Sequence, residues 1–171
     1  MILEIKKYPD PILRKKSKEV KEITPEIKQL ARDLIETMLK SEPVGIGLAA
    51  PQIGISKRVI AVQTDSGPAV FVNPKIIKKS REKDSMEEGC LSLPEIWLNV
   101  KRAKEIEIET LDINDKKMRI KADGVFARIL QHEIDHLNGI LIIDKLNPWQ
   151  KLKRPLKGAN NGSKVGNKNR L

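Results

Sequence analysis

The chain has 171 residues, with 33 lysines and arginines against 23 acids, a net charge of +10 and a single cysteine. This length suits one domain that buries its own core, and a single cysteine excludes an internal disulfide. The N-terminus lacks the apolar stretch of a secretory signal, and the longest purely aliphatic run is Ile140 to Ile143, so we expect a cytoplasmic protein that does not span a membrane.

The first element predicted along the chain is an N-terminal amphipathic helix that opens at Thr24-Pro25 and ends before Pro43. Proline is favoured in the first turn of a helix, and apolar residues then recur every three or four positions. The residues expected on its apolar side are Ile27, Leu30, Ala31, Leu34, Ile35, Met38 and Leu39.

Two hairpins are predicted in the middle of the chain. The apolar runs 59–62 and 69–72 flank the turn sequence Ser66-Gly67-Pro68. Further on, isoleucines alternate with glutamates over 105–110, and the chain turns at 112–115 before a return strand. The order of helix, strands and a final helix predicts an α+β domain, with mostly antiparallel sheets packed around a central C-terminal helix.

That final helix is predicted to begin at Asp123, a favoured N-cap residue, and to end at Asn138-Gly139. It contains His132-Glu133-Ile134-Asp135-His136, which uses both histidines of the chain. Residues four apart on a helix project within about 40° of each other, so both imidazoles can reach one cation while Glu133 points at its open position. Burying these polar side chains among apolar neighbours costs free energy unless they gain a binding partner. A metal ion would be such a partner.

Two other segments carry residues that suit a catalytic site. Residues 45–54, Gly-Ile-Gly-Leu-Ala-Ala-Pro-Gln-Ile-Gly, allow another backbone to approach closely and offer Gln52 as an uncharged donor. They match neither a phosphate-binding loop nor a dinucleotide fingerprint. Residues 88–95, Glu-Gly-Cys-Leu-Ser-Leu-Pro-Glu, contain Cys90. A lone cysteine is usually a small buried hydrophobe, but Gly89 beside it favours a site that another chain can approach.

The spacing alone leaves the third metal ligand open. Metalloproteases with this motif use a histidine six residues after the second one, or a downstream glutamate. Here Ile142 occupies the first position, and no glutamate follows Glu133. Asp144 is the only carboxylate after the motif, so a metallopeptidase completed by Asp144 is one alternative and Cys90 from upstream is the other.

Taken together, the three segments resemble peptide deformylases, whose signature consists of a Gly-x-Gly-Leu-Ala-Ala-x-Gln block, a Glu-Gly-Cys-Leu-Ser block and a Gln-His-Glu-x-Asp-His-Leu block. All three blocks occur here in that order, and Tyr8-Pro9-Asp10-Pro11-Ile12-Leu13-Arg14 is similar to the family's opening segment. The resemblance covers residues 1 to about 146. We therefore expect a catalytic domain over 1–146 and a separate tail over 147–171.

The resemblance implies a metal-dependent hydrolase that removes the formyl group from N-formylmethionyl peptides and releases formate. Cys90, His132 and His136 would bind one divalent ion, with ferrous iron expected and zinc or nickel able to replace it. Glu133 would take a proton from the attacking water and return it to the leaving amine. The donors to the developing oxyanion would be the Gln52 side chain and the backbone N–H of Leu91.

Substrate contacts are implied in the same way. Ile46, Gly47 and Gly89 match family positions whose backbone pairs with an extended peptide. Val125 and Ile129 share the helix face of the two histidines, on the apolar side, so they would line the methionine pocket or belong to the ordinary core. Glu88 and Arg102 would form a supporting ion pair, or else remain two solvated charges.

The positive charge is concentrated at the C-terminus. Residues 145–171 hold eight lysines and arginines and no acid, so the first 144 residues account for only +2. The tail is almost free of apolar residues from Pro155 onward, so we expect disorder, with room for a short helix around 149–153. One deformylase subclass docks near the ribosomal exit tunnel through a C-terminal helix, a pattern from which this sequence departs.

A flexible polycation could still bind ribosomal RNA without sequence specificity. A non-catalytic ribosome-binding protein is therefore the third functional alternative. Because the expected ligands, base and oxyanion donors are all present, the sequence favours an enzyme.

Overall fold

The computed structural model describes residues 1–146. The basic tail over 147–171 and the short helix expected around 149–153 lie outside the described residues. The two α-helices are α1 (Pro25–Lys40) and α2 (Gly124–Leu137), and short 3-10 helices form at η1 (Pro11–Arg14), η2 (Ala50–Ile53) and η3 (Ile142–Lys145). The strands are β1 (Gly47–Ala49), β2 (Val59–Thr64), β3 (Gly67–Lys79), β4 (Lys83–Cys90), β5 (Leu93–Ala103), β6 (Glu105–Leu111) and β7 (Lys117–Asp123).

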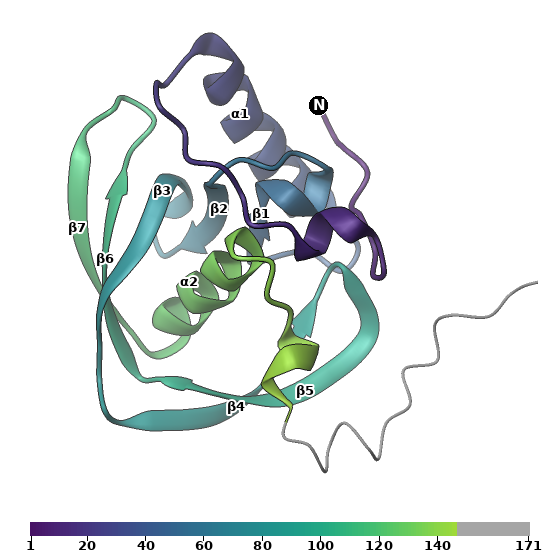
Figure 1. Cartoon of the computed structure of the whole chain (residues 1–171), viewed down its shortest axis with the longest axis vertical. Helices are drawn as coiled ribbons and strands as arrows, with labels where there is room; N and C mark the ends of the chain where they lie inside the picture. The colour runs from purple at the N-terminus through teal and green to yellow at the C-terminus, as the bar shows by residue number, and fades with distance from the viewer. Residues whose placement is uncertain (147–171) are drawn as a thin grey trace, which may run out of the picture.

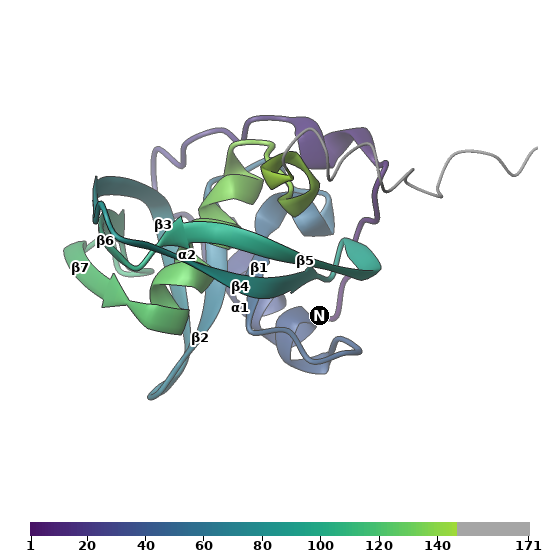
Figure 2. The same cartoon turned by 90° about the horizontal axis from the view of Figure 1, so that it is seen from below.

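The strands form two antiparallel sheets. Five of them associate in the order β1-β2-β3-β6-β7, and β4 pairs with β5 as a separate ribbon. Helix α2 contacts strands of both sheets, and Figure 1 shows it in the middle of the molecule with the strands curving around it. Figure 2 shows the β4–β5 ribbon crossing the molecule beside α2. The predicted α+β class with antiparallel sheets is confirmed.

Both predicted hairpins are present. Val62 pairs with Ala69 across the first turn, and Leu111 pairs with Lys117 across the second. Helix α1 starts at the predicted proline and buries one face against the sheet, although Leu39, expected on that face, is exposed near the helix end. Within residues 1–146, no helix is both long and apolar enough to span a bilayer.

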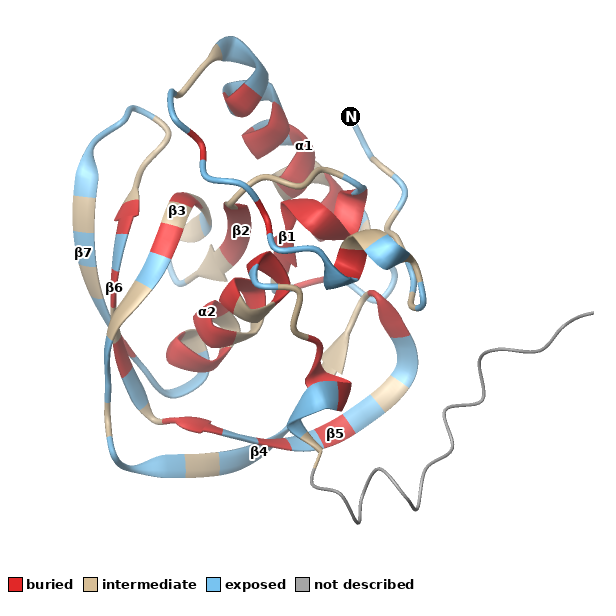
Figure 3. Ribbon diagram, viewed as in Figure 1, coloured by how far each residue is buried: buried red, intermediate tan, exposed pale blue. Residues whose placement is uncertain are grey.

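The β4–β5 hairpin was not predicted from the sequence. Strands are recognised by alternating apolar residues, whereas the only buried residue of β4 is Glu88. Figure 3 shows β4 mostly exposed beside β5, whose buried positions alternate at Leu98, Val100 and Arg102. The inward side of β4 is therefore occupied by a charged residue that other segments must neutralise.

The boundaries of α2 agree with the prediction. Gly139 adopts a left-handed conformation with φ 72°, and a Cβ there would lie 2.4 Å from the Arg14 carbonyl oxygen, so glycine is required at this helix end. Asp123 occupies the N-cap position without a capping side-chain hydrogen bond. Val125 is 54% exposed in the first turn of α2, so of its two expected places the ordinary core is excluded, and the methionine pocket stays a prediction.

Candidate metal centre

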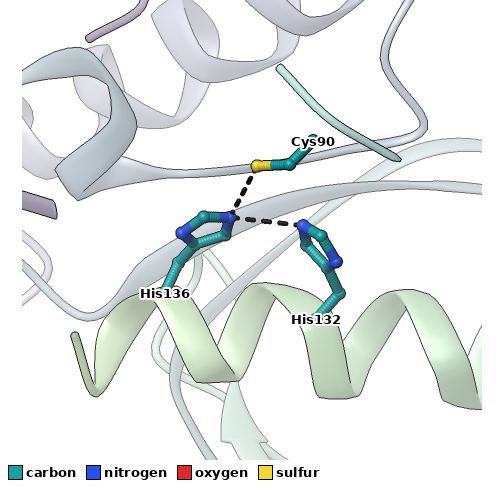
Figure 4. Close-up of side chains that lie close together, drawn as sticks. All are labelled: Cys90, His132 and His136. Carbon is teal, nitrogen blue, oxygen red and sulfur yellow. Dashed lines mark hydrogen bonds between the residues drawn. The ribbon is translucent and has the colours of Figure 1, made fainter. Parts of the chain in front are cut away.

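The cysteine and the two histidines meet at one point. Cys90 ends β4, His132 and His136 lie one turn apart on α2, and Figure 4 shows the three side chains converging. The Nε2 atom of His136 lies 3.2 Å from the Cys90 sulfur and 3.2 Å from the His132 Nε2 atom. Two nitrogens bound at about 2.0–2.1 Å to one tetrahedral ion would lie about 3.3 Å apart. The arrangement therefore fits a metal ion held by one sulfur and two imidazoles.

The electrostatics of these groups also favour a cation. Burial opposes ionisation of Cys90, but His136 and His132 hold the pKa of its thiol well below the usual range. The thiolate is the form that binds metals. Burial also opposes charge on His132, yet Cys90 and Glu88 raise the pKa of His132 to about 10. A positive charge between these side chains is thus stabilised, and a divalent ion would be stabilised in the same way.

Glu88 orients the His132 ring through Nδ1, the ring nitrogen that does not face the metal position. Its Oε2 atom lies 3.0 Å from His132 Nδ1, so a proton on Nδ1 leaves the Nε2 lone pair directed at the metal position. Arg102 donates to both carboxylate oxygens of Glu88, at 2.6 and 2.9 Å, which confirms the ion pair expected from the sequence. Burial would raise the pKa of Glu88, but hydrogen bonds from His132 and Arg102 lower it, to about 2.

Sequence reasoning missed two further partners of this network. Arg128 is buried, donates to Glu88 Oε1 at 2.6 Å and to the Val100 carbonyl oxygen at 2.8 Å, and also pairs with Asp84. Asp135 accepts a hydrogen bond from Arg102 at 2.8 Å. Arg128 could have been found, because it precedes His132 by four positions and therefore shares its helix face.

Glu133 packs against the backbone of β1. An ideal Cβ built on Gly47 would lie 2.3 Å from Glu133 Oε1, so this position requires glycine for the carboxylate to fit. The Oε2 atom of Glu133 is buried and has no hydrogen-bond partner within residues 1–146. Such an orphaned atom is costly unless a water or ion satisfies it. Burial also raises the pKa of Glu133, the direction that favours uptake of a proton by a general base.

Gln52 is buried on the other side of the cysteine. Its Oε1 atom accepts a hydrogen bond from the Ala49 backbone, which directs Nε2 toward Ser92 Oγ at 3.2 Å and the Cys90 sulfur at 3.7 Å. Ser92, which the sequence reasoning did not single out, is fully buried and holds the Gln52 amide. Leu91 follows Cys90 directly, and its carbonyl oxygen accepts a hydrogen bond from Lys7.

The residues expected to contact substrate differ in their burial, and Ile129 packs against a hydrophobic core cluster. Ile46 is 55% exposed and directly precedes β1, the edge strand of the large sheet. Gly89 lies at an irregularity in the β4–β5 pairing, between Glu88 and Cys90. Val125 is exposed and Ile129 is half-buried.

Asp144 lies outside the metal cluster. Its carboxylate pairs with Arg14 and accepts a hydrogen bond from the Leu141 backbone at the start of η3. Among the residues that the structure describes, the only group of histidine, cysteine and acidic side chains with metal-ligand geometry is Cys90, His132 and His136, whose ligand atoms lie within 4.8 Å of one another.

Comparison with known proteins decides the family. The sequence matches the family model described as Polypeptide deformylase over residues 2–152. The chain belongs to the polypeptide deformylase family. A peptide deformylase from Desulforudis audaxviator is 44% identical over 153 residues, which cover 89% of this chain and 98% of the relative.

Solved structures agree with this assignment. Peptide deformylase from Thermotoga maritima superposes with a TM-score of 0.82 at 39% identity, covering 86% of this chain and 99% of that one. The enzyme from Synechococcus elongatus, solved in complex with actinonin, has a TM-score of 0.82 at 39% identity, with 88% and 82% covered. The protein is therefore an enzyme that removes the N-formyl group of nascent polypeptides, and its family consists of metalloenzymes.

Proposed function

We propose that Cys90, His132 and His136 hold the catalytic metal ion of this deformylase and that Glu133 is its acid and base. The observation that carries the proposal is the convergence of one sulfur and two Nε2 atoms beside a buried carboxylate oxygen without a partner. Three protein ligands leave one position open, the pattern of catalytic rather than structural sites. Glu88, Arg102 and Arg128 would fix the orientation of His132.

In the proposed reaction, the attacking water would be activated at the metal ion and Glu133 would transfer its proton. Cys90, His132 and His136 would hold the ion, which would supply activation of the attacking water by lowering its pKa from about 15.7 toward 7. Glu133 accepts the proton of the water that attacks the formyl carbon, and later gives that proton to the leaving amine as the carbon–nitrogen bond breaks. The products are formate and a free N-terminus.

Gln52 and Leu91 would stabilise the charge that develops on the formyl oxygen. Gln52 is suited to this because Ala49 and Ser92 fix its amide group before the substrate arrives. The backbone N–H of Leu91 would be the second donor. Loss of one such donor typically reduces the rate by roughly 100- to 1000-fold.

We infer that the peptide binds as an added strand along β1. Strand β1 is the edge of the large sheet, so its outer side could pair with a peptide at Gly47, while the Ile46 carbonyl oxygen already accepts a hydrogen bond from the Gln63 backbone. The β4–β5 pairing is irregular at Gly89. Val125 and Ile129 lie about two turns and one turn before His132 on α2, respectively, and would line the pocket for the methionine side chain. The exposure of Val125 supports a place in an open pocket rather than in the core.

Iron is the ion we propose for the cell, although imidazole and thiolate ligands accept several first-row metals. Protein purified without oxygen is expected to contain about one equivalent of iron and to release formate from a formyl-Met peptide in proportion to that iron. Elemental analysis paired with a formate assay tests this. Full activity in metal-free protein would contradict the proposed centre, whereas activity that follows zinc or nickel would contradict only the choice of ion.

The two other functions considered from the sequence have less support. A metallopeptidase completed by Asp144 would need that carboxylate at the metal, but Asp144 is engaged with Arg14 and Leu141. A non-catalytic ribosome-binding protein would have no need of an intact set of ligands, base and amide donor. We retain the cytoplasm as the expected location, since formylated nascent chains are made there.

The basic tail remains a candidate contact with the ribosome. Its seven lysines and arginines, with Lys145 just before them and no acid among them, would contact ribosomal RNA by releasing counterions. A chain ending at Arg154 is expected to co-sediment less with ribosomes at low salt than the full chain does. Unchanged co-sedimentation would show that the residues after Arg154 have no such role, and equal formate release by both chains is the control.

A further inference from the structure

Residues 6–8, which precede η1, are hydrogen-bonded to both segments that carry the proposed oxyanion donors. The Lys6 backbone N–H donates to the carbonyl oxygen of Gln52, in η2, at 2.7 Å. Two positions further on, the Tyr8 backbone N–H donates to the Ser92 carbonyl oxygen at 2.9 Å. Because Ser92 Oγ also lies 3.2 Å from the Gln52 amide nitrogen, the three segments form one hydrogen-bonded unit.

The residue between these two contacts reaches the same unit with its side chain. Lys7 is exposed, and its Nζ atom donates a hydrogen bond to the Leu91 carbonyl oxygen at 2.8 Å. A charged donor forms a shorter and stronger hydrogen bond than a neutral one does. The Lys7 ammonium group therefore restrains the peptide group that follows Leu91.

Leu91 lies where the chain is otherwise weakly held. It is the first residue of the two-residue turn between β4, which ends at Cys90, and β5, which begins at Leu93. Such connections are generally more mobile than the strands they join. Only two rotatable backbone bonds separate the N–H of a residue from its own carbonyl group. Holding the Leu91 carbonyl group therefore limits the directions in which the Leu91 N–H can point.

We propose that Lys7 is a positioning residue for deformylation, which keeps the Leu91 N–H directed at the developing oxyanion by holding the Leu91 carbonyl group. The inference rests on the proposed function, in which that N–H is one of the two oxyanion donors. A donor fixed in advance does not have to reorient as negative charge develops on the formyl oxygen. The contribution of Lys7 is made in the transition state, so it should appear in kcat and not in KM.

A merely structural role for Lys7 predicts a different result. An exposed hydrogen bond is exchanged for hydrogen bonds to water on unfolding, so its loss changes the stability of the fold little. The Lys6 and Tyr8 backbone contacts also remain when the Lys7 side chain is changed. The turn should therefore stay folded in a Lys7 variant, with greater freedom for the Leu91 peptide groups.

The test compares three variants of the full-length, metal-loaded enzyme. Lys7→Met keeps most of the length of the side chain without the donor, and Lys7→Arg keeps a charged donor. Lys16→Met is the matched control, because Lys16 is an exposed lysine whose side chain has no hydrogen bond or ion pair within residues 1–146. Formate release from a formyl-Met peptide gives kcat and KM, and elemental analysis gives the metal content.

Lys7→Met is expected to lower kcat about tenfold, which is part of the roughly 100- to 1000-fold that the loss of a whole oxyanion donor costs. KM, metal content and melting temperature should stay at the parent's values. Lys7→Arg should recover most of the lost kcat, and Lys16→Met should match the parent in every measurement.

Nuclear magnetic resonance relaxation of the zinc-loaded enzyme measures the positioning directly. The order parameter of the Leu91 N–H should fall in Lys7→Met from about 0.85, typical of rigid backbone, toward about 0.6. It should stay at the parent's value in Lys16→Met.

A Lys7→Met enzyme with the parent's kcat would overturn the proposal. If the Leu91 order parameter had fallen in that enzyme, the donor role of Leu91 would be wrong as well, whereas an unchanged order parameter would leave that role standing. A raised KM at unchanged kcat would overturn the proposal by showing that Lys7 contacts the peptide. So would a lower kcat that Lys7→Arg does not restore, or one with an unchanged order parameter.

Discussion

Replacing Glu133 by glutamine is expected to abolish most turnover while leaving the metal ion in place. Glutamine keeps the shape of the side chain beside Gly47 but cannot accept a proton from water. General acid–base catalysis typically contributes about 100- to 10,000-fold, so kcat for formate release should fall by that factor. Metal content by elemental analysis should match the parent protein, since Glu133 is not among the three converging ligand atoms.

Glu87→Gln is the matched control, because Glu87 is an exposed glutamate of β4 with no ion pair in the described part of the chain. It should retain the parent rate. A Glu133→Gln enzyme with a near-normal rate would show that another group moves the proton. A variant that also lost its metal would indicate that Glu133 is a ligand.

Gly47→Ala tests the position of the same carboxylate without changing its chemistry. The added methyl carbon would lie 2.3 Å from Glu133 Oε1 and 2.8 Å from Glu133 Cδ, so the carboxylate must move. A displacement of about 1 Å in a catalytic group costs on the order of 100-fold in rate. We expect this loss with unchanged metal content. A normal rate would mean that the carboxylate need not occupy this position during the reaction.

Replacing Cys90 by alanine is expected to remove the metal ion itself. The sulfur is the one proposed ligand that does not come from α2. Without it, two imidazoles alone would have to hold the ion. Loss of an outer-shell partner alone typically weakens metal binding by about 10- to 100-fold, so loss of the thiolate should weaken it by more than about 100-fold. Elemental analysis after dialysis would show metal-free protein, and formate release would fall in parallel.

Thermal unfolding provides an independent measurement of that loss. A ligand that binds only the folded state stabilises it by about 2.7 kcal/mol at a concentration 100 times its dissociation constant. Added metal should therefore raise the melting temperature of the parent and leave that of Cys90→Ala unchanged. Asp144→Asn is the discriminating control: it should keep its metal, whereas a metallopeptidase completed by Asp144 would lose it. A Cys90→Ala protein that retains metal would contradict the proposed ligand set.

Much of the fold follows from local patterns. The proline at the start of α1, the glycine after α2 and the alternating residues of β6 are properties of short segments, and the structure places those elements as predicted. Strand β4 could not be found in this way, because its inward residue is Glu88. A buried carboxylate is tolerated there only because Arg102 and Arg128 neutralise it from β5 and α2. Those partners become neighbours only in the folded chain.

The residues of the candidate site, too, could be predicted only in part from the sequence. The sequence by itself determined which side chains could bind a metal, because the four-residue spacing of His132 and His136 places both on one face of any helix that contains them. It could not determine whether Cys90 joins them, since that cysteine lies 46 positions before His136.

Only the tertiary structure decided that meeting, by bringing the end of β4 against the face of α2. It also decided the contact of Gly47 with Glu133. The physical reason is that helix periodicity is set by local backbone geometry, whereas contacts between distant segments are set by how sheets and helices pack to bury their apolar faces.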